Sequence, residues 1–375
     1  MSEGYCDPAF AAVREVLDDS LAGDGDLGAA VAVSVDGRPV VDLWGGIADQ
    51  RTGRAWERDT ACITFSCTKA LTATAAVLLA ERGAVALASP VTDWWPEFGS
   101  HGKDGATGEH LLTHQVGLPA FDRPVSVEEA ADPIAMADQL AGQTPEWQPG
   151  SAHGYHAITF GWLAGELVRR HAGMSVGDFV RAEFGADLRI GVPPAALDGL
   201  ARIAAGRPAK ADDLAAPRAD VTRLVAATQD PDSLFQRSTA NPAASFNKPA
   251  VLRGGWPAAG LVSTARALAG FYAQLIGGTI LSPATLGDAL HERVRGPDRT
   301  LVLDSAFGLG FMRPSANMHL PESARTAFGH PGASGALGIG DVEQRIAVAY
   351  VPNLTRPPLG DRRAHRLVQA AYGSL

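Results

Sequence analysis

Lysine is scarce in this chain, which holds it only at positions 69, 103, 210 and 248. Arginine supplies most of the positive charge, yet no run of basic residues occurs and the formal net charge is −9. Proteins that bind nucleic acid need a basic stripe or patch, so we expect no nucleic-acid partner. Because lysine is so rare, its appearance in a motif carries more weight than usual.

Cysteine and long apolar runs are also sparse. Cys6, Cys62 and Cys67 are the only cysteines, and three cannot all pair within one chain. Segment 1–7 has neither the positive charge nor the apolar stretch of a signal peptide, so we expect a cytoplasmic protein with free thiols. The apolar run 70–80 is too short for a membrane helix and is bounded by charged residues, so we expect no membrane partner.

The remaining composition is that of an ordinary globular protein. Hydrophobic residues make up 46% and charged residues 19% of the 375 positions. A chain of this length exceeds the usual size of a single hydrophobic core, so we expect one large unit or two lobes.

Strand signals lie near both chain ends. The runs 29–35 and 40–44 flank an Asp36-Gly37 turn, which predicts a hairpin. Four more strand-like runs follow toward the C-terminus, at 301–303, 307–312, 336–339 and 346–351. Such an arrangement predicts one antiparallel sheet built from both termini.

Helical spacing of apolar residues occupies much of the remaining sequence. It predicts helices at 8–21, 66–82, 157–171, 176–184, 264–276 and 362–372, with Gly83 capping the second. We therefore expect an α+β fold of the α/β sandwich type. Its sheet part would comprise residues 1–92 and 255–375, and a mainly helical lobe, 93–254, would be inserted between them.

The pattern Ser-x-x-Lys, which can pair a hydroxyl nucleophile with an amine, occurs three times, starting at Ser66, Ser100 and Ser245. Three-residue spacing brings both side chains to one face only on a helix. Glycine and polar neighbours predict a surface loop for the second copy, and a proline after the lysine keeps the third out of the helical region. Only the first copy opens a long apolar helix, so Ser66 and Lys69 are the candidate pair.

Lys69 stands in an unfavourable place for a structural lysine. A cation in the first helical turn opposes the helix dipole, and the helix that follows has almost no polar face, which implies burial. Burial would lower the pKa of the amine, and a neutral amine can accept the proton of the Ser66 hydroxyl. The alternative is that Ser66 caps the helix and Lys69 reaches solvent.

Other nucleophiles fit less well. Segment 173–177 matches Gly-x-Ser-x-Gly, but a predicted helix rather than a strand precedes Ser175. Asp178, three residues later, makes Ser175 a helix cap instead. Cys67, beside Ser66 on an apolar helix, is interpreted as a packing residue.

Metal binding is considered for the histidines. His110 and His114 have the spacing of a zinc-binding helix but lack the glutamate that follows the first histidine in such motifs. Together with His153 and His156, we interpret them as structural or surface residues. The sequence has no Gly-rich phosphate loop, so we expect neither a metal nor a cofactor.

Three segments occur in an order that resembles a known superfamily. Residues 66–69 open a helix, residues 153–157 precede a second helix, and residues 328–335 precede a strand. In this order they resemble the serine β-lactamase and penicillin-binding-protein superfamily. The most similar branch is the class C β-lactamase-like esterases, called family VIII carboxylesterases. The resemblance implies a β-lactamase-like fold with the active site in the cleft between sheet and helical lobe.

The resemblance also implies residue roles. Ser66 would be the acylated nucleophile, Lys69 its proton acceptor, and Tyr155 the phenol that passes the proton to the leaving group. The backbone N–H groups of Ser66 and Ala333 would form the oxyanion hole. The implied substrate-binding residues are His330, Gly332, Ser334 and His156.

The chain departs from the β-lactamase pattern in two places. Ala157 replaces the asparagine of the tyrosine motif, and His330-Pro331-Gly332 replaces Lys-Thr-Gly. A mostly neutral histidine and a proline are poor ligands for a substrate carboxylate. We therefore expect a serine hydrolase that cleaves a small uncharged ester or thioester. The alternatives are an acyltransferase of natural-product biosynthesis, a β-lactamase or D-amino-acid peptidase, and a non-catalytic binding protein.

Overall fold

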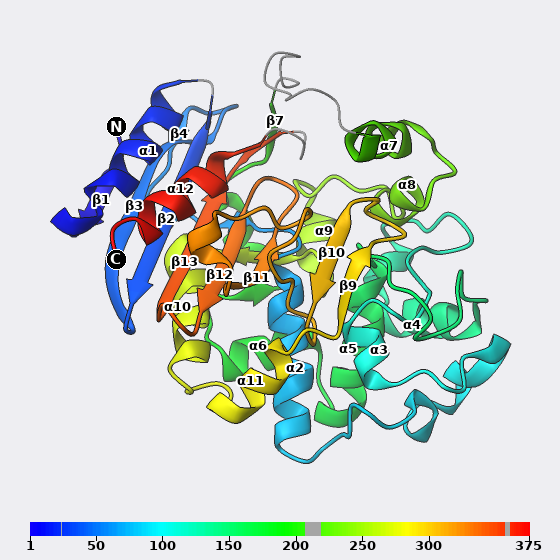
Figure 1. The fold of residues 1–375 in the computed structure, drawn as a ribbon. Coiled ribbons are helices and arrows are strands. Elements are labelled where there is room, and N and C mark those ends of the chain that lie inside the picture. The colour runs from blue at the N-terminus through cyan, green and yellow to red at the C-terminus, as the bar shows by residue number, and fades with distance from the viewer. Residues whose placement is uncertain (24, 207–218, 357–360) are drawn as a thin grey trace.

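The computed structural model describes residues 1–23, 25–206, 219–356 and 361–375. Its main element is a seven-stranded sheet with the order β1-β3-β2-β13-β12-β11, in which β4 pairs with β3 outside this path. The strands are β1 (Glu3–Cys6), β2 (Gly28–Val35), β3 (Arg38–Asp49), β4 (Arg54–Ala55), β11 (Phe328–Pro331), β12 (Leu337–Asp341) and β13 (Ile346–Pro352). The antiparallel pair β2–β13 joins the two ends of the chain at the middle of the sheet (Figure 1).

Both faces of this sheet are covered, which explains why β2 and β13 are continuous apolar runs. Ala30 and Ala32 of β2 pack in one apolar cluster with α10 (Ala265–Ile276). Val31 and Val33 pack in a second cluster with α1 (Ala11–Ala22) and α12 (Arg363–Tyr372) on the opposite face. Side chains alternate across a strand, so one run supplies both layers.

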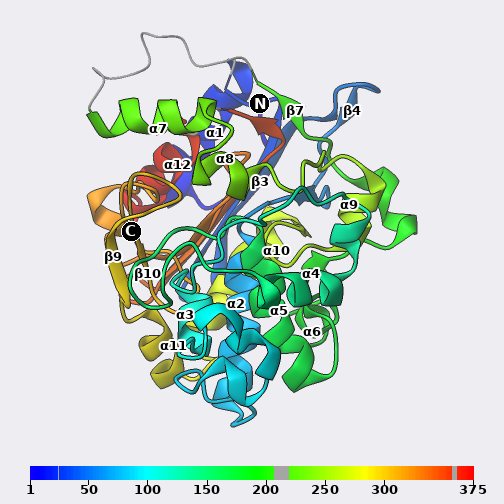
Figure 2. The ribbon, with the colours of Figure 1, turned by 90° about the vertical axis from the view of Figure 1, so that its right-hand side faces the viewer.

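Several of the other helices pack around α2 (Thr68–Glu81), which is buried along nearly its whole length. Figure 2 shows α5 (Thr159–Ala172) next to α2, with α4 and α6 beside it. The remaining helices are α3 (Gly108–Leu112), α4 (Pro133–Gly142), α6 (Val176–Glu183), α7 (Ala219–Gln229), α8 (Leu234–Thr239), α9 (Pro249–Gly254) and α11 (Pro283–Leu290). Across the described ranges, no helix has the length and apolarity that a bilayer crossing requires.

Three small sheets complete the described structure. The strand β8 (Leu261–Ser263) lies between β5 (Cys62–Ile63) and β6 (Arg189–Ile190). The other two are β9 (Val294–Pro297) with β10 (Asp304–Phe307), and β7 (Ala204–Ala205) with β14 (Leu354–Thr355). Because β6 lies in segment 93–254 and pairs with β8, this segment and the C-terminal segment share a sheet; the division at 92 and 254 stays a prediction.

Most of the predicted elements occur. The hairpin corresponds to β2 and β3, and four predicted helices match α5, α6, α10 and α12 within one or two residues. Gly83 ends α2 as expected, with φ +75 and its N–H donating to the carbonyl of Ala80. The helix α2 begins at Thr68, however, so Ser66 lies in the turn before it.

Two strand predictions were wrong. Residues 301–303 form a turn because Asp298 Oδ1 accepts the backbone N–H groups of Thr300 and Leu301. The run 307–312 ends as a strand at Phe307, and the chain then turns through Gly310, which has φ +75. A Cβ at Gly310 would lie 2.2 Å from the Cβ of Ala73, so only glycine allows this close approach to α2.

The second Ser-x-x-Lys copy is not the surface loop that we expected. Lys103 is fully buried, and its Nζ donates to the carbonyl oxygens of Ser100, at 2.8 Å, and of Gln143. These carbonyls replace water around the amine, and the lysine stem packs inside the protein. The third copy is as expected: Lys248 is extended and precedes α9.

We expect Lys103→Met to lower the free energy of unfolding by roughly 2–4 kcal/mol, because two buried carbonyls lose their donor. Urea unfolding followed by tryptophan fluorescence measures this change. Lys248→Met, at an exposed lysine, is the matched control and should leave the stability unchanged. Equal stability of the two variants would contradict a structural role for Lys103.

Candidate active site

Ser66 lies in a tight turn between β5 and α2. Phe65 before it has φ +49, and the N–H of Thr68 donates to its carbonyl at 3.0 Å. The Thr68 hydroxyl also donates to this carbonyl and accepts the N–H of Leu261 at 2.8 Å. These bonds hold a left-handed backbone that a phenylalanine rarely adopts, and they leave Ser66 half-buried at the start of the helix.

Lys69 lies beneath Ser66 and has no exposed surface, which contradicts the alternative of a solvent-reaching lysine. Its Nζ lies 3.3 Å from Ser66 Oγ, 2.6 Å from the Ala157 carbonyl oxygen and 3.0 Å from the Ala258 carbonyl oxygen. All three partners of the amine are uncharged. Burial therefore lowers the pKa of the Lys69 amine well below its usual value.

The three contacts of Lys69 suit a neutral amine. An –NH₂ group has two protons and one lone pair, and the two carbonyl oxygens can only accept hydrogen bonds. With both protons donated to Ala157 and Ala258, the lone pair is left for the Ser66 hydroxyl. The geometry thus provides a base directed at the serine.

Tyr155 lies on the other side of Lys69. The amine is 4.6 Å from the centre of the tyrosine ring, and the ring stacks against Phe307. Burial raises the pKa of the Tyr155 phenol, while a side-chain hydrogen bond with Ser66 acts in the opposite direction. The phenol is therefore a neutral hydroxyl in contact with Ser66.

His330 contacts Tyr155 from β11. Its Nδ1 lies 2.7 Å from the carbonyl oxygen of Pro331, which can only accept, so Nδ1 carries the proton. The unprotonated Nε2 lies 3.4 Å from the Tyr155 hydroxyl and accepts from it. Burial, with a contribution from Lys69, lowers the pKa of His330 to about 3, so the ring is neutral.

The predicted oxyanion segment follows directly after β11. A Cβ at Gly332 would lie 2.2 Å from the carbonyl oxygen of Thr64, so the end of β11 passes close to the turn that holds Ser66. The N–H of Gly335 donates to the carbonyl of Gly332 at 2.9 Å and closes a turn. Ala333 stands exposed at the corner of this turn.

Two of the implied substrate-binding residues point inward. His156 is fully buried; its Nε2 accepts the N–H of Leu118 at 2.9 Å, and its Nδ1 donates to the carbonyl of Gly154 at 2.6 Å. Both ring nitrogens are occupied, so His156 belongs to the wall behind the site. Ser334 is also fully buried, and within the described ranges its hydroxyl has no hydrogen-bond partner.

Sequence reasoning missed Asp298, which holds Tyr155 in place. This carboxylate is 3% exposed, and its Oδ1 accepts the backbone N–H of Tyr155 at 3.0 Å. Its Oδ2 accepts from Ser305 Oγ at 2.7 Å, and that hydroxyl lies 3.0 Å from His153 Nε2. Gly-Pro-Asp at 296–298 indicates only a turn. The carbonyls of Ala157 and Ala258 were also missed, because backbone acceptors leave no signal in a sequence.

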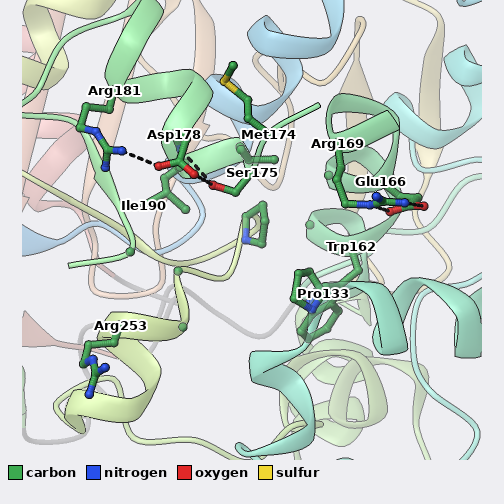
Figure 3. A pocket seen from close by; sticks show the side chains of 18 of the residues that line it. Pro133, Trp162, Glu166, Arg169, Met174, Ser175, Asp178, Arg181, Ile190 and Arg253 are labelled. Atoms are coloured by element: carbon green, nitrogen blue, oxygen red, sulfur yellow. Dashed lines mark hydrogen bonds and ion pairs between the residues drawn. The ribbon is translucent and has the colours of Figure 1, made fainter. Parts of the chain in front are cut away.

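The Gly-x-Ser-x-Gly match lies in a different part of the molecule. Figure 3 shows a cavity of about 600 Å³ lined by Trp162, Ser175, Asp178 and Arg181, among others. Ser175 caps α6 by accepting the N–H of Asp178 at 3.1 Å, and its Oγ donates to the Asp178 carboxylate. These two bonds are those of a capping residue, so Ser175 is the helix cap that we expected.

No group of three or more histidine, cysteine, aspartate or glutamate side chains is arranged to hold a metal ion in the described ranges. The candidate residues of the site are Ser66, Lys69, Tyr155 and His330. All four are close together, and the three of them that titrate near neutral pH or above are kept uncharged by burial.

The chain is similar over most or all of its length to several known proteins. The chain is 33% identical over 371 residues to the Mycobacterium tuberculosis protein named Esterase/beta-lactamase LipL, covering 95% of this chain and 84% of that protein. The crystal structure of a family VIII carboxylesterase matches with a TM-score of 0.88 and 29% identity over 100% of both chains. A penicillin-binding protein homologue from Caulobacter crescentus matches with a TM-score of 0.86 and 35% identity, also over 100% of both chains.

The profile of the Beta-lactamase family matches residues 13–372, which is nearly the whole chain. The antiparallel sheet with its flanking helices is the β-lactamase-like fold of the matching structures. The chain therefore belongs to the beta-lactamase family.

Proposed function

We propose that this protein is a serine esterase that cleaves a small ester or thioester through an acyl-enzyme on Ser66. The observation that carries the proposal is the position of the Lys69 amine, which lies 3.3 Å from Ser66 Oγ and donates to two carbonyls. The names of the relatives support the substrate class, since they include an esterase and a family VIII carboxylesterase.

Acylation begins with transfer of the Ser66 hydroxyl proton to neutral Lys69. Ser66 Oγ bonds to the carbonyl carbon of the ester, and the electron pair of the C=O bond moves to the carbonyl oxygen. The N–H groups of Ser66 and Ala333 would stabilise this oxyanion. The C–O bond to the leaving group then breaks, and the leaving alkoxide takes up the proton from Lys69 through the hydroxyl of Tyr155.

Deacylation repeats these steps with water. A water molecule loses a proton to Lys69 by way of Tyr155, and the hydroxide bonds to the acyl carbon. The bond to Ser66 Oγ breaks, Ser66 regains the proton, and the carboxylic acid leaves. Another alcohol in place of water would make the same acyl-enzyme an acyltransferase, and the site contains nothing that commits it to that acceptor.

His330 has a different role in this proposal from the substrate contact expected from the resemblance. Its Nε2 accepts from the Tyr155 hydroxyl, so it orients the phenol rather than facing substrate. A neutral imidazole also offers no charge to a substrate carboxylate. Uncharged esters are therefore favoured over β-lactams, although the mycobacterial relative is named for both activities.

We also propose a cytoplasmic location, which the three free cysteine thiols support.

We expect Ser66→Ala to lower ester turnover by on the order of 10⁴-fold or more, because no acyl-enzyme can form. Intact-mass spectrometry after exposure to a phosphonate ester should show one adduct on the wild type and none on the variant. Ser175→Ala, at the other motif serine, is the matched control and should label normally. Normal turnover by the Ser66 variant would refute the proposal.

We expect ester hydrolysis to depend on a group that is active when unprotonated. The pKa of Lys69 is lowered, so the neutral amine predominates above that pKa, and kcat/KM should rise with pH through it. Lys69→Arg should be inactive at every pH, since a guanidinium does not lose its proton.

His330→Gln serves as the comparison in the same pH titration. The pKa of His330 is about 3, so its charge does not change over the working range and the acid limb should keep its midpoint. An acid limb whose midpoint moves in His330→Gln, or ester hydrolysis that persists in Lys69→Arg, would contradict the assignment of Lys69 as the base.

A further inference from the structure

Arg363, at the start of α12, makes an unusual set of buried contacts. Its Nη1 lies 2.7 Å from Asp26 Oδ1 and 3.0 Å from the carbonyl oxygen of Leu354. Its Nε and Nη2 contact the two oxygens of Asp361 at 2.9 and 2.6 Å. The same Nη2 donates to the carbonyl oxygen of Ser334 at 2.9 Å. The guanidinium thus connects three distant segments of the chain.

The Ser334 carbonyl belongs to the turn that presents Ala333. The peptide between Ser334 and Gly335 is held at both ends: its N–H donates to the carbonyl of Gly332 at 2.9 Å, and its C=O accepts from Arg363. Gly335 has φ +88, and a Cβ there would lie 2.6 Å from Arg363 Nη2. The turn therefore closes directly onto the guanidinium.

A contribution to the stability of the fold does not by itself explain the buried network around Arg363. Desolvating a guanidinium and two carboxylates costs several kcal/mol per ion, and apolar residues of similar size often stabilise a core equally well. The guanidinium group is planar and rigid, so the directions of its N–H donors are set before any hydrogen bond forms. It is therefore well suited to holding a backbone carbonyl in one position. Arg363 itself cannot shift, since two carboxylates hold it from other sides.

We propose that Arg363 is a positioning residue for the oxyanion hole: it fixes the turn 332–335 so that the Ala333 N–H faces the carbonyl oxygen of the bound ester. The inference rests on the proposed function of Ser66 and Ala333. An oxyanion donor contributes most when it is in place before charge develops, because no reorganisation is then needed during reaction. Arg363 provides that rigidity without contacting substrate.

The test compares Arg363→Lys with Tyr350→Phe. Lysine keeps the positive charge beside Asp26 and Asp361. Its single amine cannot make two parallel hydrogen bonds to Asp361 and also reach the Ser334 carbonyl. Tyr350 is the matched control, because its hydroxyl donates to Asp26 at 2.6 Å and belongs to the same buried network without touching the turn. A purely structural network predicts similar losses in the two variants.

We expect Arg363→Lys to lower kcat for a chromogenic acetate ester by roughly 10- to 100-fold, with KM changed by no more than about twofold. The inhibition constant of phenylboronic acid should rise by a similar factor. Its boron bonds to Ser66 Oγ and presents a boronate oxygen to the oxyanion hole, while the serine proton passes to Lys69. Tyr350→Phe should stay within about twofold of the wild type in all three constants.

Equal kcat and equal boronate affinity in Arg363→Lys and Tyr350→Phe would overturn the inference. If the lysine variant does not fold, Gly335→Ala takes its place, because the added methyl would lie 2.6 Å from both Arg363 Nη2 and Asp361 Oδ2 and so disturb the contact between guanidinium and turn, while Arg363 and its bond to Asp26 remain. It should show the same loss of kcat and of boronate affinity, and wild-type values would overturn the inference. Phosphonate labelling of the wild type separates the two proposals: without label on Ser66 the proposed function fails, whereas labelling with unaffected variants refutes only the role of Arg363.

Discussion

The rest of the site depends on a lysine amine held inside the protein without a counter-charge. A charged amine in this position would have to give up its hydration, and the described structure places around it two backbone carbonyls, one hydroxyl and the face of the Tyr155 ring, none of them charged. Losing a proton removes most of that cost and converts Lys69 into a base. The apolar helix α2 secures the burial, and the tight contact of Gly161 with Ala258, where a Cβ would lie 2.5 Å from the backbone nitrogen, brings one of the carbonyls within reach. The packing of α5 thereby acts on the chemistry at Ser66.

The same exclusion of charge extends to the neighbours of Lys69. Burial raises the pKa of Tyr155 and lowers that of His330, so both rings stay neutral beside the amine. Asp298 is the nearby carboxylate, and it lies behind Tyr155, where backbone N–H groups and Ser305 occupy both of its oxygens. In the proposed mechanism a proton passes among Ser66, Lys69 and Tyr155, and this environment places no fixed charge that would hold it at one of them. Because the described groups around Ser66 are uncharged, they fit the proposed preference for an uncharged ester.

Local patterns in the sequence predict much of this arrangement. They fail where contacts between distant segments determine the local structure or the burial of a side chain. The apolar helix after Lys69 and the runs of β2 and β13 follow from residue periodicity, which records burial directly. Residues 301–303 look like a strand but turn because a carboxylate at position 298 captures their N–H groups. Lys103 looks exposed but is enclosed by a carbonyl forty residues away, at Gln143. His156 follows the motif tyrosine, yet its ring turns to the backbone of Leu118, so neighbourhood in sequence misleads about which side chain faces the site.

The sheet explains why the two halves of the site keep their alignment. Ser66 and Lys69 come from the N-terminal part of the chain, whereas His330 and Ala333 come from the C-terminal part, and the pairing of β2 with β13 and of β12 with β11 connects the two. Side chains alternate along β11, and His330 pairs with Gly338, so a slip of one residue would turn His330 away from Tyr155. Gly338 has no Cβ, and a Cβ there would lie 2.7 Å from the ring of Tyr272 in α10, so packing against α10 limits the register. Arg363 also connects the two parts, because it bonds both to Asp26, before β2, and to the turn after β11. A site assembled from both chain ends thus needs its rigidity from the sheet and from a buried ion pair, because the covalent connection between the halves runs through more than two hundred residues.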